Sequence, residues 1–169
     1  MGQRVLTDVE PDLGRHVGAG SSYGACLAPL GNIAARLHAI GAQAKSPYGP
    51  GSPFLLVCDH ASNVLPPEYG SLGLPASEFE RHIAWDPGAA ALVAALAARL
   101  DAPAILSCFS RLLIDPNRGR DAPTLVMQLS DGRIVPGNAA VADAEIEARI
   151  ERFYAPYHQA IEAAIDEGV

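Results

Sequence analysis

One short segment combines an apolar run with polar side chains that can carry chemistry. The run from Phe54 to Cys58, preceded by glycine and proline, predicts a buried strand of the parallel type. The polar residues that follow it are Asp59, His60, Ser62 and Asn63. Ligands of open α/β sheets bind outside the carboxyl ends of strands, and an imidazole beside a carboxylate and an amide suits a metal or acid–base site. The alternative is that these side chains only complete a turn.

Length and composition limit the classes of protein to consider. The 169 residues fit one domain, and the 49% hydrophobic content is enough for a core. A net charge of −7 argues against a nucleic-acid partner. No segment reaches the roughly 18 apolar residues of a membrane span, and the start has no apolar signal core, so we expect a cytoplasmic location. Cys58 and Cys108 lie in apolar runs, where buried thiols in a reducing cytosol are the simplest account.

The chain divides into two regions at a turn-rich linker. Residues 1–50 are rich in glycine and serine and carry one candidate helix over residues 32–44. The compact region, residues 51–169, alternates strand and helix patterns. Ser77 with Glu80 predicts a capping box for a first short helix, and Asp86 with Pro87 predicts the start of a second. This second helix extends to about residue 100, with Ala90, Val93, Leu96 and Leu100 on one face.

A second strand and a long helix complete the pattern. Residues 103–109 predict a strand, so that strand, helix and strand form a right-handed crossover unit. Residues 112–114 and 124–129 are candidates for further short strands. Residues 143–167 predict the longest helix, which Pro156 should kink. Its apolar stripe consists of Ile146, Ile150, Phe153, Tyr157, Ile161 and Ile165.

Two residues suit a metal site of the kind found in zinc hydrolases. Such a site needs three protein ligands, commonly histidine and carboxylate, and an open position for water. His60 and Asp86 suit two of those places, and His82 could support them. The alternative for Asp86 is strong, because aspartate before proline is a good helix cap without any metal.

A second group of residues suits a carboxylate. Arg118 can grip a carboxylate with two parallel hydrogen bonds, and the amide of Asn117 adds a donor. The alternative is a solvated loop in which arginines offset acidic neighbours. That loop contains Arg111, Asp115, Arg118, Arg120 and Asp121.

Several motifs, in this order, together resemble the N-formylglutamate amidohydrolase family. They are Cys58-Asp-His-Ala-Ser-Asn63, Leu72-Gly-Leu74, His82-Ile-Ala-Trp-Asp-Pro-Gly-Ala89, Ser110-Arg-Leu-Leu-Ile-Asp-Pro-Asn-Arg118, Ser130-Asp-Gly132, Ile134-Val-Pro-Gly-Asn138 and Phe153-Tyr-Ala-Pro-Tyr-His158. The resemblance covers about residues 52 to 167, whereas residues 1–45 resemble no family known to us. It implies an α/β fold, a three-layer α/β/α sandwich with a mixed sheet, as in zinc carboxypeptidases and succinylglutamate desuccinylases.

The resemblance also implies a function. It implies hydrolysis of an N-acyl amino acid, N-formyl-L-glutamate to formate and glutamate, on the route of histidine degradation. His60 and Asp86 would bind Zn²⁺, and Asn117 with Arg118 would hold a substrate carboxylate. Arg111 would help with the second carboxylate. The remaining polar residues of the motifs would support these groups: Asp59, Asn63 and His82.

Members of the family run on past the last residue of this sequence. On the resemblance, a third metal ligand and a general base would lie beyond Val169, and the sheet would be incomplete. Two rivals therefore stand beside the zinc amidohydrolase. One is an inactive fragment or a carboxylate-binding module that lacks the third ligand. The other is a different metal hydrolase on the same scaffold, such as a cell-wall amidase or an acylamino-acid hydrolase.

Overall fold

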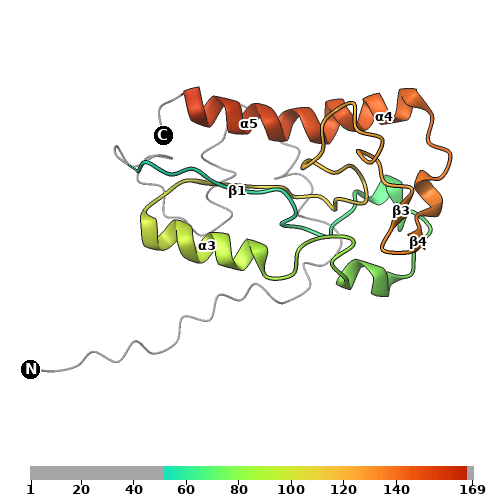
Figure 1. Cartoon of the computed structure of the whole chain (residues 1–169), viewed down its shortest axis with the longest axis horizontal. Helices are drawn as coiled ribbons and strands as arrows, with labels where there is room; N and C mark the ends of the chain where they lie inside the picture. The colour runs from blue at the N-terminus through green and yellow to red at the C-terminus, as the bar shows by residue number, and fades with distance from the viewer. Residues whose placement is uncertain (1–51, 167–169) are drawn as a thin grey trace, which may run out of the picture.

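The computed structural model of the chain describes residues 52–166 (Figure 1). The N-terminal region of residues 1–50, with its candidate helix over 32–44, lies outside the described residues. The described part contains two small sheets, one parallel and one antiparallel, together with α-helices, short 3₁₀ helices and one π-helical turn. None of its helices is long and apolar enough to cross a bilayer.

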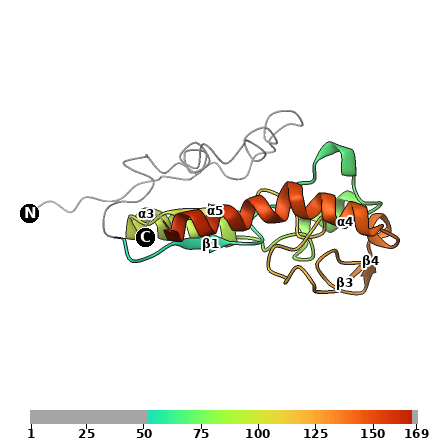
Figure 2. The ribbon, with the colours of Figure 1, turned by 90° about the horizontal axis from the view of Figure 1, so that it is seen from above.

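The strand–helix–strand unit predicted from the sequence is confirmed. Strand β1 (Leu56–Cys58) pairs in parallel with β2 (Ala104–Leu106), and helix α3 (Ala89–Leu100) connects them. Figure 1 shows β1 between α3 on one side and α5 on the other, and the three lie at about one level in the view from above (Figure 2). Both strands are shorter than the apolar runs that predict them. Because the strands are parallel and Cys58 pairs with Leu106, their carboxyl ends lie side by side. Both strands lead into loops that carry polar residues.

Strand β1 and helix α3 are less buried than the sequence predicts. Only Cys58 of β1 is buried, and the side chain of Val57 is 40% exposed. Helix α3 has no buried residue, and Leu96 and Leu100 of its expected inner face are exposed. The reason is the size of the sheet, because within residues 52–166 two three-residue strands offer α3 little apolar surface.

Two helix starts differ from the prediction. The first short helix is a 3₁₀ helix (Ala76–Glu80) that begins after Pro75, so the capping box at Ser77 is wrong. Helix α3 begins after Gly88, whose φ of 89° is open mainly to glycine, and not after Asp86. No side chain caps either helix. The side chain of Asp86 is therefore not used as a helix cap.

The two short strands predicted for residues 112–114 and 124–129 are wrong. Leu112 and Leu113 lie in a turn, Ile114 follows it, and all three are buried, while only the last residue of 124–129 is in a strand. Their apolar character reflects burial in the core and not strand pairing. The strands of this region are β3 (Leu129–Ser130) and β4 (Arg133–Ile134), which form an antiparallel hairpin. A 3₁₀ helix (Pro136–Asn138) follows, and another (Pro67–Tyr69) lies after β1.

The long helix is confirmed, with an interruption near Pro156. It consists of α4 (Asp143–Arg149), a π-helical turn (Ile150–Tyr154) and α5 (Ala155–Asp166). Proline has no N–H to donate, so a widened turn just before it accommodates the lost hydrogen bond. Ile165 is 60% exposed, while Ala164 is buried. The angular position of Ile165 explains its exposure. Each residue advances the helix by about 100°, so Ile165 lies about 120° around the helix from the buried Phe153.

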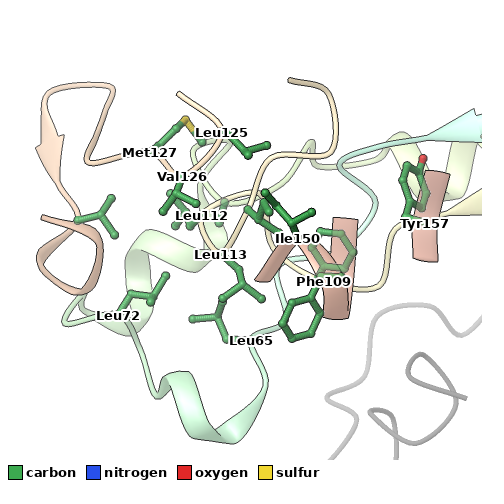
Figure 3. Packing of buried hydrophobic residues seen from close by; sticks show 14 of the residues in the cluster. Leu65, Leu72, Phe109, Leu112, Leu113, Leu125, Val126, Met127, Ile150 and Tyr157 are labelled. Carbon is green, nitrogen blue, oxygen red and sulfur yellow. The ribbon is translucent and has the colours of Figure 1, made fainter. Parts of the chain in front are cut away.

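The core lies between this long helix and the loops that follow β2. Figure 3 shows Phe109, Leu112 and Leu113 packed with Leu65 and Ile150. The ring of Phe109 is 5.7 Å from that of Phe153 and 6.5 Å from that of Tyr157. The described residues are consistent with an α/β fold. They do not contain the mixed sheet of the expected three-layer sandwich, because the parallel and antiparallel pairs are separate.

Candidate functional site

His60 lies two residues after the end of β1, with both ring nitrogens facing carboxylates. Its side chain is 6% exposed. Nε2 lies 2.7 Å from Oδ1 of Asp115, and Nδ1 lies 3.4 Å from Oδ2 of Asp86. These residues come from three loops that are distant in sequence, at the carboxyl ends of β1 and β2 and ahead of α3. The fold thus brings His60 and Asp86 together, as the sequence motifs require.

The spacing of these groups fits two ligands of one metal ion. Two atoms that each bind Zn²⁺ at 2.0–2.2 Å in a tetrahedron are about 3.4 Å apart. Because Nε2 of His60 donates to Asp115, the lone pair of Nδ1 is left on the side of Asp86. Within residues 52–166, no cluster of three or more histidine, cysteine, aspartate or glutamate residues forms a metal site. The roles of His60 and Asp86 as ligands stay a prediction.

The backbone holds Asp86 beside His60. Its N–H donates to the carbonyl of His60 over 2.9 Å. Its side chain is 53% exposed, and its Oδ1 lies 3.7 Å from NH1 of Arg111. The preceding residues are fixed as well, since the carbonyl of Ala84 accepts from the Ser110 hydroxyl at 2.8 Å. The carboxylate of Asp86 is therefore held in place by the loop and remains accessible to solvent.

Asp115 is the buried centre of the site. Its side chain has no exposed surface, and it accepts hydrogen bonds from His60, from Arg111 NH2 at 2.9 Å and from the N–H of Asn117 at 3.0 Å. Burial alone would raise the pKa of Asp115, but the bond from His60 and the charge of Arg111 lower it below its usual value. The alternative that Asp115 belongs to a solvated loop is therefore wrong, because its side chain is fully buried.

His60 and Asp115 also act on each other electrostatically. Burial by itself lowers the pKa of His60, but the hydrogen bond and the charge of Asp115 outweigh it, so the pKa is raised. In a protein without metal, a proton on Nδ1 would face Asp86. A metal ion would take the place of that proton, because zinc binds the neutral imidazole.

The residues expected to hold a carboxylate lie on the same loop. Arg118 is 46% exposed, and its Nε is 3.7 Å from Oδ2 of Asp115. Asn117 is exposed, while Arg111 is mostly buried against Asp115. The Nε of Arg111 is a buried donor with no partner among the described residues. The fold therefore gathers all three beside His60, and their contact with a substrate stays a prediction.

The three residues expected to support the metal ligands bind elsewhere. Oδ1 of Asp59 accepts from the hydroxyl of Tyr157 at 2.7 Å, and the amide of Asn63 donates to the carbonyl of Phe79 at 2.8 Å. His82 is 68% exposed and lies 3.8 Å from Asp131. In the described structure the ring of His60 contacts Asp115 and Asp86, and none of these three residues.

Three residues of the long helix, which the sequence assigns only to a family motif and an apolar stripe, also contact the loops of the site. The hydroxyl of Tyr154 donates to the carbonyl of Arg118 at 2.8 Å, and Nε2 of His158 lies 3.1 Å from the carbonyl of Pro116. With Tyr157, they occupy positions i, i+3 and i+4, which share one face of a helix. The sequence therefore contains the signal, three polar aromatic side chains on one helix face. It is hard to recognise because Tyr157 also belongs to the apolar stripe.

Comparison with known proteins identifies the family. The family model described as N-formylglutamate amidohydrolase matches residues 52–168. The crystal structure of gene product Atu2144 from Agrobacterium tumefaciens is similar, at 40% identity with a TM-score of 0.66. That match covers 67% of this chain and 45% of the other, so this chain spans less than half the length of that relative. No curated protein matches the chain. On the family match and the order of its motifs, the chain belongs to the N-formylglutamate amidohydrolase family.

Proposed function

We propose that the chain is a metal-dependent amidohydrolase that cleaves N-formyl-L-glutamate to formate and L-glutamate. The observation that carries the proposal is the 3.4 Å separation of His60 Nδ1 and Asp86 Oδ2, with Nε2 held by Asp115. The family match supports a hydrolase acting on an amide. We also propose a small-molecule substrate, since the net charge of −7 argues against a nucleic acid. A cytoplasmic location is proposed as well.

The residues of the site divide into two roles. His60 and Asp86 would hold Zn²⁺, and Asp115 fixes the tautomer and orientation of the His60 ring. When bound, zinc would polarise the amide carbonyl and lower the pKa of a water molecule to about 7.

Substrate recognition rests on the exposed arginine. Arg118 presents a half-exposed guanidinium beside Asn117, and this pair can bind a carboxylate with parallel hydrogen bonds. Arg111 is tied to Asp115 and adds positive charge near Asp86. Two carboxylates on one substrate fit this distribution of charge, which favours N-acyl glutamate over monocarboxylic amides.

The experiment measures formate release together with metal content. The full chain is loaded with Zn²⁺ and incubated with N-formyl-L-glutamate, N-acetyl-L-glutamate and N-formyl-L-leucine. We expect release of formate from the first substrate and the least turnover of the last. Bound zinc should fall in H60A. Stoichiometric zinc retained in H60A would contradict the ligand assignment.

The same experiment separates the rivals. Binding of N-formyl-L-glutamate without turnover in a zinc-loaded chain would support a carboxylate-binding module. Faster turnover of another acyl group would support a different metal hydrolase on the same scaffold.

A further inference from the structure

Helix α5 and the π-helical turn ahead of it hold two of the three loops of the site. The hydroxyl of Tyr154 reaches the carbonyl of Arg118 at 2.8 Å, and Nε2 of His158 lies 3.1 Å from the carbonyl of Pro116. On the same face, the hydroxyl of Tyr157 donates to Asp59, the neighbour of His60, at 2.7 Å. One helix face therefore bonds to the loop after β1 and to the loop of Asn117 and Arg118.

The three side chains also support one another. The rings of Tyr154 and His158 are 4.2 Å apart, and those of Tyr157 and His158 are 5.5 Å apart. Tyr157 is 6% exposed and packs edge-on against Phe109 in the core. This packing limits the rotation of the three rings. Their polar atoms are thereby aimed at the two loops.

The π-helical turn places these residues. Ile150–Tyr154 is wider than an α-helical turn, and it ends where the contacts to the loops begin. Such turns are often found at functional sites. A continuous α-helix would rotate Tyr157 and His158 relative to the buried Ile150, because one fewer residue would fill that turn.

We infer that Tyr154, Tyr157 and His158 are positioning residues, which fix the loop of Arg118 and the loop of His60 in one arrangement. The helix thus sets the distance between the carboxylate-binding side chain and the metal-binding side chain. This inference rests on the proposed function for the role of Arg118, but its geometric part can be tested without turnover.

The test uses two variants that each remove one hydroxyl and keep the ring, Y154F and Y157F. Hydrogen exchange is followed at three amides of the full chain. The amides of Asn117 and Arg118 donate to Asp115, and that of Ala61 donates to the Ser107 hydroxyl. We expect Y154F to speed exchange at residues 117 and 118 by about 2- to 10-fold and to leave residue 61 unchanged. Y157F should speed exchange at residue 61 by a similar factor and leave residues 117 and 118 unchanged.

The pattern of exchange decides between positioning and general stability. Equal acceleration throughout the core in both variants, or no change at any of the three amides, would overturn the inference. In the zinc-loaded enzyme, Y154F should raise KM for N-formyl-L-glutamate about 2- to 10-fold while kcat stays within about twofold. A loss confined to kcat would also overturn it. Absence of turnover in the unsubstituted chain would refute the proposed function alone, since the exchange pattern is read without substrate.

Discussion

Nε2 of His60 lies 2.7 Å from Oδ1 of Asp115, a residue 55 positions further along the chain. The carboxylate is fully buried, and Arg111 and the N–H of Asn117 occupy its other hydrogen-bonding positions. Asp115 thus connects the proposed metal ligand to the loop that carries the proposed carboxylate-binding residues. A change at this one residue should affect both parts of the site.

The first prediction concerns the affinity for zinc. D115N removes the negative charge that strengthens His60 as a ligand, so zinc affinity should fall by about 10- to 100-fold. Competition with a chromophoric chelator measures this change. D131N is the matched control, because Asp131 is 51% exposed and pairs with Arg81 on the surface. An unchanged affinity in D115N would show that Asp115 does not tune the metal ligand.

The second prediction concerns substrate binding. R118A should raise KM for N-formyl-L-glutamate by about 10- to 100-fold with little change in kcat, since a charged hydrogen bond contributes about 1.5–3 kcal/mol. R118K should recover part of this loss, because lysine keeps the charge but not the two parallel bonds. R120A is the control, since Arg120 is 63% exposed and pairs with Glu147. Equal KM values for R118A and R120A would remove Arg118 from the site.

The periodicity of apolar residues in the sequence predicts two strands and the long helix. The strand after Pro53, the second strand and the long helix from Asp143 all appear in the structure. The motifs also single out His60 and Asp86, whose Nδ1 and Oδ2 atoms lie 3.4 Å apart. These features follow from runs of apolar residues and from the turns that separate them.

What the sequence did not predict depends on contacts between distant residues. Asp115 looks like part of a solvated loop, because its neighbours are polar, yet the fold buries it against His60. The start of α3 depends on the conformation of Gly88, which outweighs the capping pattern at Asp86. Pro156 predicts an interruption of the long helix, but not that it takes the form of a π-helical turn over Ile150–Tyr154. The burial of Asp115 and the start of α3 at Gly88 have no such local signature.

The third prediction concerns a buried amide that holds the core loops. Asn138 is fully buried, donates to the carbonyls of Leu112 and Met127 at 2.8 Å each, and accepts from Arg149 at 2.9 Å. N138A leaves two carbonyls and a guanidinium without this partner, so it should lower the free energy of unfolding by about 3 kcal/mol or more. Urea denaturation measures the loss. N117A, at an exposed position, should change stability by less than about 0.5 kcal/mol. Similar losses in both variants would contradict this role.

The fourth prediction concerns two glycines with positive φ. Gly73 has a φ of 77°, and a Cβ there would lie 2.9 Å from Cβ of Pro136. Gly132, in the β3–β4 turn, has a φ of 72° and open space around it. G132A should therefore cost only the backbone strain, about 1–2 kcal/mol. G73A should cost more, because Pro136 is rigid and must move with the turn that carries Asn138. Denaturation of both variants under the same conditions isolates the contact, since the backbone strain is common to them. A loss in G73A no larger than that in G132A would mean that the contact with Pro136 relaxes without cost.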